Sequence, residues 1–176
     1  TACRRLRKTP GPMPLRFALL ALVSFSLSAC DSVGLVAPLE PEADVQAWDE
    51  MLEAVNAVRA EGAVCGGDRM GPAEPLIWDS RLERAARAHA RDMVENDFFG
   101  HTSSDGTRMG DRVRRAGYDW AVVGENLARY QQSVDEVVAD WVESPGHCRQ
   151  LLDPSFLEVG AAQVDGHWTQ VFGVPR

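Results

Sequence analysis

Lysine is almost absent from the chain, and cations as a whole are outnumbered by acids. Lys8 is the only lysine, so residues 30–176 offer no lysine for Schiff-base chemistry. Residues 1–29 hold five of the 18 Lys and Arg residues and no acid, which leaves 13 cations against 26 acids in the remainder. A domain so acidic neutralises phosphates poorly, and the composition therefore argues against nucleic acid as a partner.

Long apolar runs are also lacking. The longest, Phe17–Leu27, has 11 residues, whereas a membrane-spanning helix needs about 20. This run follows a short basic stretch that begins at Met13, the expected translation start, and it precedes small residues, as in a secretory signal. We therefore expect residues 1–29 to consist of a miscalled or extended N-terminus followed by a signal peptide.

The end of the apolar run, Leu27-Ser28-Ala29-Cys30, resembles a bacterial lipobox. The resemblance implies that Cys30 is acylated and becomes the mature N-terminus, which would anchor the protein to a membrane on the periplasmic or extracellular face. The alternative is an ordinary signal peptide followed by a chance cysteine. With lipidation, residues 30–43 are the lipidated cysteine and a tether, and residues 44–176 are the folded domain.

The remaining chain shows clear helix and strand patterns. Apolar residues recur at intervals of three and four, and Ser80-x-x-Glu83 and Ser133-x-x-Glu136 have the form of helix-capping boxes. Asp165-Gly166 between two strand-like runs predicts a β-hairpin, and the glycines and prolines of 65–77 predict a loop. Together these patterns predict an α+β layered domain. The expected helices cover 44–61, 80–96, 107–116 and 133–144, and the expected strands cover 120–129, 157–164 and 167–174.

Cysteines are few. Cys3 precedes the expected start and Cys30 is the expected lipid site, which leaves Cys65 and Cys148. An even pair in an exported chain predicts a disulfide. The alternative is that Cys148 acts as a nucleophile beside His147, but adjacent residues rarely point at each other as a Cys–His pair requires.

The chain has four histidines and no H-E-x-x-H or Cys-x-x-Cys motif, which disfavours a standard zinc protease or zinc finger. His89 lies on the apolar face of its helix and is expected to be a core histidine. His167 begins the last strand and is expected to be exposed. His101 lies in a turn-rich loop and His147 follows the Pro-Gly break of a helix. Two loop histidines can converge, but spacing alone does not show that they do.

Glu125 is the most informative acid. On a strand over 120–129 it faces the same way as Val123 and Leu127. An acid on an apolar face is either paired or shifted in pKa, and both are typical of functional sites. The alternative is an edge strand whose apolar face is partly wet.

Four motifs occur together in order along the chain. They are Phe99-Gly100-His101-Thr102-Ser103, Gly124-Glu125-Asn126-Leu127-Ala128, Trp141-x-x-Ser144-Pro145-Gly146-His147 and Phe156-x-Glu158-Val159-Gly160. These motifs resemble the bacterial branch of the CAP superfamily, which groups cysteine-rich secretory proteins, antigen five of venoms and plant pathogenesis-related proteins, and the match covers about residues 48–174.

The resemblance implies a three-layer α–β–α sandwich with a surface cleft that binds zinc or another divalent ion in some members. His101, Glu125 and His147 match the cleft residues. Many eukaryotic members supply a second glutamate from the helix that ends near Trp141, and Ser144 stands at that place here.

Membership in this superfamily does not fix activity. We expect a membrane-tethered, extracytoplasmic domain that binds a divalent metal, zinc first, or a small molecule, lipid or envelope ligand in the cleft of His101, Glu125 and His147. A metal-assisted hydrolase acting on the cell envelope is the alternative, since two histidines and a carboxylate leave an open metal position. A structural envelope protein with a vestigial cleft is the third reading.

Overall fold

The computed structural model describes the backbone of residues 41–176 and the side chains from Trp48 onward. The expected signal peptide, the lipobox cysteine Cys30 and most of the expected tether lie outside these described residues. Eleven elements follow one another along the described chain: α1 (Pro41–Glu61), β1 (Ala63–Cys65), β2 (Asp68–Met70), β3 (Ile77–Trp78), α2 (Ser80–Glu95), α3 (Met109–Arg115), β4 (Trp120–Arg129), α4 (Val134–Glu143), α5 (Pro145–Leu151), β5 (Glu158–Val164) and β6 (His167–Pro175).

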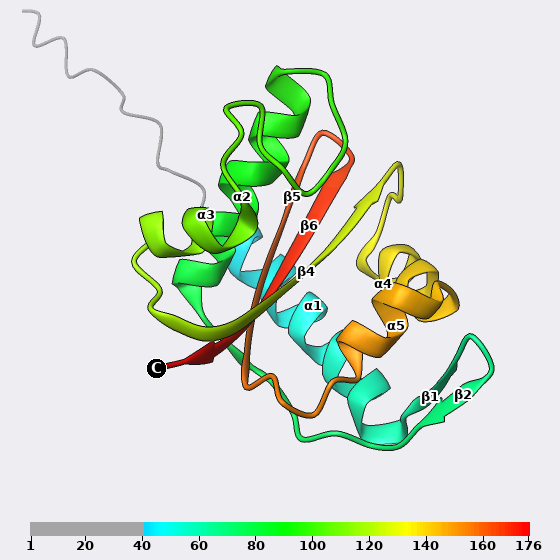
Figure 1. Ribbon diagram of the computed structural model, residues 1–176. Coiled ribbons are helices and arrows are strands. Elements are labelled where there is room, and N and C mark those ends of the chain that lie inside the picture. Colours follow the sequence, from blue (N-terminus) through cyan, green and yellow to red (C-terminus); the bar gives the residue numbers. More distant parts are fainter. Residues whose placement is uncertain (1–40) are drawn as a thin grey trace, which may run out of the picture. The chain divides into compact units, whose positions relative to one another are not determined.

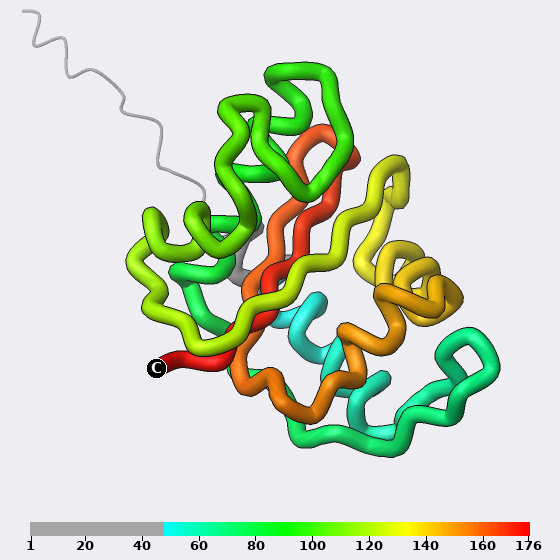
Figure 2. Tube along the Cα trace, in the orientation of Figure 1, coloured from blue at the N-terminus to red at the C-terminus, as the bar shows by residue number. Residues whose placement is uncertain are grey.

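A four-stranded sheet in the order β3-β5-β6-β4 runs through the middle of the domain. The β5–β6 hairpin turns at Asp165 and Gly166, both at positive φ (43° and 75°), which confirms the two-residue Asp-Gly turn expected from the sequence. β4 pairs antiparallel with β6, and β3 pairs parallel with the start of β5. The turn of the hairpin, the end of β4 and the loop between α2 and α3 lie at the same end of the sheet (Figure 2).

Helices cover both faces of this sheet (Figure 1). Successive residues of a strand point to opposite faces, and on β6 Phe172 packs in a core with α1, α4 and α5, whereas Val171 packs in a second core with α2 and α3. This arrangement is the predicted three-layer α–β–α sandwich. No helix within residues 41–176 is both long and apolar enough to cross a membrane.

The predicted helices and strands are observed with small shifts at their ends, and β4 has the predicted bounds. One capping prediction is wrong: Asp79, not Ser80, caps α2, because its Oδ1 accepts from the backbone N–H groups of Arg81 and Leu82 at 2.8 and 3.2 Å. The other capping box is confirmed, with Ser133 Oγ accepting from the backbone N–H of Glu136 at 3.2 Å.

Two short segments differ from the sequence prediction. The expected loop over 65–77 contains all of β2, the last residue of β1 and the first residue of β3. The glycine pair Gly66-Gly67 at positive φ makes the hairpin turn, and strands this short show no readable alternation. The helix break at Ser144 is correct, but a new helix, α5, starts at once, since Pro145 occupies a first-turn position that needs no backbone N–H.

Candidate functional site

The side chain of Glu125 is buried in the middle of β4 and fully engaged. It is 2% exposed, and its Oε2 accepts from Arg112 Nη2 at 2.6 Å while its Oε1 lies 2.9 Å from His101 Nδ1. Of the two interpretations left open by the sequence, the buried and paired carboxylate is therefore correct. β4 is indeed an edge strand, but the side chain of Glu125 is shielded from solvent.

Arg112 ties this carboxylate to the loop that carries His101. The arginine projects from α3, its side chain is 7% exposed, and its Nη1 donates to the His101 carbonyl, Ser103 Oγ and the Thr107 carbonyl at 3.0, 3.2 and 3.3 Å. One guanidinium thus holds both the backbone of the histidine loop and the carboxylate that faces the histidine ring.

His89 supports the same loop from α2. Its ring is fully buried, and Nε2 lies 2.8 Å from the Gly100 carbonyl, so the expected core histidine is confirmed. Burial lowers the pKa of His89 despite the nearby Glu125 carboxylate, which favours a neutral ring that donates from Nε2 and accepts from Ser103 Oγ at Nδ1. His89 therefore shapes the loop and does not face solvent as a ligand.

His101 presents its ring at the surface with one nitrogen already occupied. Its side chain is 61% exposed, and the hydrogen bond to Glu125 raises its pKa against the opposing effect of partial burial. A neutral ring whose Nδ1 faces a carboxylate carries its proton on Nδ1, which leaves Nε2 as a free lone pair.

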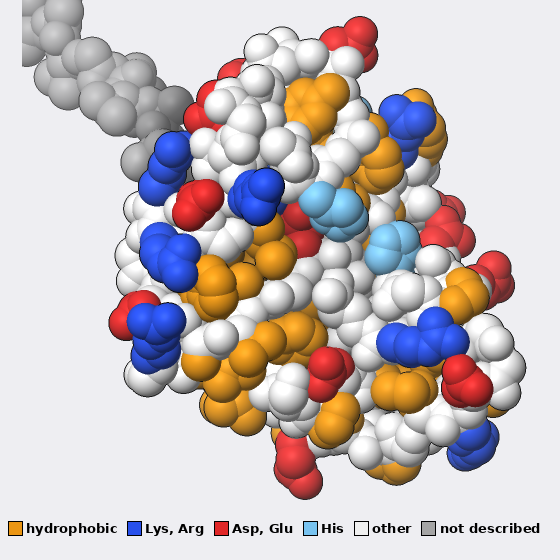
Figure 3. Space-filling model, viewed as in Figure 1, with side chains coloured by type: hydrophobic (Ala, Val, Ile, Leu, Met, Phe, Trp, Pro, Cys, Tyr) orange, Lys and Arg blue, Asp and Glu red, His pale blue; other side chains and the backbone are white. Residues whose placement is uncertain are grey.

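His147 lies in the first turn of α5, so its expected loop position is wrong. Partial burial lowers its pKa, and the charge of protonated His101 lowers it further. The two imidazoles therefore influence each other electrostatically, and Figure 3 shows histidine side chains near the middle of this face of the domain.

An amide network fixes the helix of His147 against β4. Asn126, next to Glu125 but on the opposite face of the strand, donates from Nδ2 to the His147 carbonyl at 3.4 Å and to Gln170 Oε1 at 3.2 Å, and it accepts from Gln150 Nε2 at 2.8 Å. A side chain at Gly124 would force Gln150 to move, because its Cβ would lie 2.6 Å from Gln150 Oε1. The Gly-Glu-Asn sequence thus lets one strand hold a histidine-bearing segment on each face.

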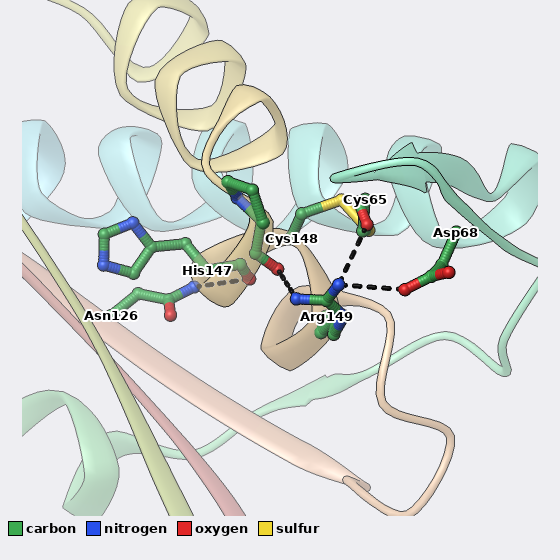
Figure 4. Close-up of a disulfide and its surroundings, with 7 residues drawn as sticks. Cys65, Asp68, Asn126, His147, Cys148 and Arg149 are labelled. Atoms are coloured by element: carbon green, nitrogen blue, oxygen red, sulfur yellow. Dashed lines mark hydrogen bonds and ion pairs between the residues drawn. A yellow bond between two sulfur atoms is a disulfide. The ribbon is translucent and has the colours of Figure 1, made fainter.

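The disulfide between Cys65 and Cys148 is present, with a Cα–Cα distance of 5.5 Å, so Cys148 has no free thiol and the nucleophile alternative is excluded. It joins β1 to α5, directly beside His147 (Figure 4). Arg149 adds to this attachment by donating to the Cys65 carbonyl and to Asp68. The His147 ring points away from the disulfide, toward the side where Asn126 lies (Figure 4).

No three His, Cys, Asp or Glu side chains within the described part of the chain are placed to hold one metal ion. At this site both oxygens of Glu125 are already bonded, one to Arg112 and one to His101. The donor set that remains is the pair of imidazoles, His101 and His147. Ser144, at the place of the second glutamate of eukaryotic relatives, is half-buried at the junction of α4 and α5.

Sequence reasoning missed two residues that build the site. Arg112 is one of several arginines in its helix, and nothing in the sequence separates it from Arg114 or Arg115. Asn126 had a usable signal, because strand alternation places it opposite Glu125, on the face that meets α5.

The α–β–α sandwich is the fold of a CAP domain, and the chain belongs to the cysteine-rich secretory protein family, whose family model matches residues 52–172. The Bacillus subtilis protein YkwD is 35% identical over 101 residues, which are 56% of this chain and 39% of YkwD.

Solved structures agree. An extracellular SCP-domain protein of Bacillus anthracis is 26% identical, with a TM-score of 0.65 over 73% of this chain and 40% of that one. An outer surface protein of Borrelia burgdorferi, at 21% identity, shares the fold with a TM-score of 0.59 over 78% of this chain and 96% of its own. The chain spans about two fifths of YkwD and of the Bacillus anthracis protein.

Proposed function

We propose that this protein is an exported, membrane-tethered CAP domain that binds a divalent transition metal, zinc first, between His101 and His147. The observation that carries the proposal is the contact of His101 Nδ1 with the buried carboxylate of Glu125 at 2.9 Å. A carboxylate at the far nitrogen of a histidine fixes the ring and makes its other nitrogen a better ligand, as is common around protein-bound zinc.

The protonation states favour the same role. Burial lowers the pKa of His147, so this ring is neutral and able to ligate at neutral pH. The raised pKa of His101 increases the competition between protons and metal for this ring, and metal affinity should fall as the pH drops toward and below the histidine reference value of about 6.5. With two protein ligands, water fills the other positions and affinity is modest compared with a four-ligand structural site.

Glu125 acts in this proposal as the hydrogen-bond partner of His101 and not as a third ligand. Its second oxygen is bound by Arg112 at 2.6 Å, and release of that buried ion pair would leave a guanidinium without its counter-charge. Arg112 and Asn126 are positioning residues, which act through His101 and the backbone of His147 respectively.

Calorimetric zinc titration tests the proposal. The wild type should bind zinc, and His101→Ala and His147→Ala should each weaken it by about ten-fold or more, in line with the effect of losing metal-site residues. His167→Ala is the matched control, because His167 is a half-buried histidine outside the cleft. Equal zinc affinity in the wild type and both cleft variants would show that these histidines do not form a metal site.

Export and anchoring form a separate part of the proposal. They rest on the signal-like Phe17–Leu27 run, the lipobox-like Leu27-Ser28-Ala29-Cys30 and the extracellular relative from Bacillus anthracis. We expect Cys30 to be the acylated N-terminus, held far more firmly than the marginal binding of a single acyl chain. Intact-mass analysis of native protein should show a lipidated chain that begins at Cys30, and a soluble form that begins elsewhere would contradict it.

A further inference from the structure

One pocket of the domain shares no residue with the site of His101, Glu125 and His147. It encloses about 270 Å³ and lies where α1, the end of β3, α2 and the start of α4 meet around β5 and β6. Its apolar walls are Trp48, Met51, Trp78, Val134 and Trp168, its floor is Ala161 and Ala162, and its polar groups are Arg87, Gln132 and Gln163. We call it the tryptophan pocket.

One donor in this pocket has no acceptor. The indole N–H of Trp78 is buried and makes no hydrogen bond with any described residue. Buried tryptophan N–H groups normally find a partner, and an orphan calls for an explanation such as a bound ligand. By comparison, Trp168 donates to the Gln131 carbonyl at 3.0 Å, so its indole N–H is satisfied.

The floor of the pocket is an open sheet edge. Within the described chain, β3 pairs with β5 only at Glu158 and Val159, and no other strand lies on that side. The backbone of Val159 faces β3, where its carbonyl accepts from the Asp79 N–H at 2.9 Å. Since direction alternates along a strand, the backbone groups of Ala161 and Gln163 face the same, unpaired side. They offer both donors and acceptors.

The polar side chains that line the tryptophan pocket contribute no unpaired charge. Arg87 is paired with the buried Glu83 at 3.0 Å, and among the residues whose side chains are described no other charged residue lines the pocket. Gln132 donates from Nε2 to the Tyr130 carbonyl at 2.7 Å, and its Oε1 can accept a hydrogen bond from a ligand hydroxyl. An anion is poorly matched to this balance, and an alkyl chain would leave the indole N–H and the amides without partners.

We propose that the tryptophan pocket binds one neutral pyranose unit of a glycan. Such a ring has an apolar C–H face that packs on the π-face of an indole, and three indoles line the pocket, of which Trp48 and Trp78 stack on each other with centroids 6.1 Å apart. Its hydroxyls both donate and accept, as the amides and the open edge require, and one of its oxygens accepts from Trp78. Apolar walls with a few placed polar groups are typical of small-molecule sites.

Indole N–H resonances of the full-length protein in ¹H–¹⁵N NMR spectra test this proposal directly. Chitotriose and maltotriose are titrated separately, with decanoate as an apolar probe. The Trp78 resonance should move saturably with at least one trisaccharide and not with decanoate, while the Trp120 resonance, from an indole outside the pocket, should stay fixed. His147→Ala should leave the sugar titration unchanged, which separates this site from the metal site.

Two variants locate the contact. Trp78→Phe keeps an aromatic ring, though a smaller one, and removes the N–H, so it should weaken sugar binding about three- to ten-fold, as expected for one neutral hydrogen bond. Trp48→Ala removes a wall and should weaken it further. Trp120→Phe is the matched control and should leave the sugar affinity unchanged. No saturable shift with either sugar, a response to decanoate alone, or full affinity in Trp78→Phe and Trp48→Ala together would overturn the proposal.

Discussion

Within the site, removal of the ion pair between Arg112 and Glu125 should lower the free energy of unfolding most. Both side chains are buried, at 7% and 2% exposure, and their charged groups meet at 2.6 Å. Arg112→Met deletes the counter-charge and leaves the carboxylate buried, which should lower the free energy of unfolding by about 3–5 kcal/mol. It also removes the donor that holds the His101 and Thr107 carbonyls.

A double-mutant cycle separates the pair from the general damage. Glu125→Leu alone leaves Arg112 buried without its counter-charge and should lower the free energy of unfolding by a similar amount. The double variant buries no unpaired charge. Its loss should therefore fall short of the sum of the single losses by about 2–3 kcal/mol. Urea denaturation followed by tryptophan fluorescence measures all four species.

Arg115→Met is the matched control, since Arg115 in the same helix is 68% exposed and lies 3.4 Å from an exposed Asp105. This variant should change the free energy of unfolding by less than about 1 kcal/mol. If Arg112→Met behaves like Arg115→Met, or if the cycle is additive within about 0.5 kcal/mol, the buried network does not hold the site together.

The remaining predictions concern the disulfide and the other histidines. Loss of the Cys65–Cys148 bridge, which closes 83 residues of sequence, should lower the free energy of unfolding by about 2–5 kcal/mol in urea melts; an unchanged midpoint in the double-serine variant would contradict this. His89→Ala should cost about 2–4 kcal/mol through lost packing and an orphaned carbonyl, with zinc affinity unchanged in calorimetry. Burial lowers the pKa of His89 and His147. As the pH falls, these two imidazoles therefore take up protons more readily in the unfolded chain than in the folded chain. Stability should therefore fall as the pH drops below about 6.5, while the raised pKa of His101 acts in the opposite direction, and urea melts at pH 8 and 5.5 that coincide would refute the net prediction.

Patterns that repeat over a whole element were sufficient to predict most of the fold. The apolar spacing of α1, the alternation of β4 and the Asp165-Gly166 turn each reflect local geometry, and each is observed. The elements that were missed are too short for such patterns. β1 and β2 have three residues each, and α5 fills seven residues directly after a correctly predicted helix break.

The site was only partly accessible from sequence. Alternation correctly flagged Glu125 as an acid on a buried face, but its partners come from α3 and from a loop 24 residues away. Which arginine of α3 turns inward depends on tertiary packing, and Arg112, Arg114 and Arg115 look alike in the chain. The convergence of His101 and Glu125 was expected only from the family resemblance.

The central claim is that Glu125 holds the proton of His101 on Nδ1 and so leaves Nε2 for a metal shared with His147. Long-range ¹H–¹⁵N NMR spectra of the imidazoles, recorded above the raised pKa of His101 with and without zinc, test this most directly. The account predicts a neutral Nδ1–H tautomer for His101 and zinc-dependent shifts of an unprotonated ring nitrogen in both histidines. An Nε2–H tautomer for His101, or resonances of both rings that zinc leaves unchanged, would contradict it.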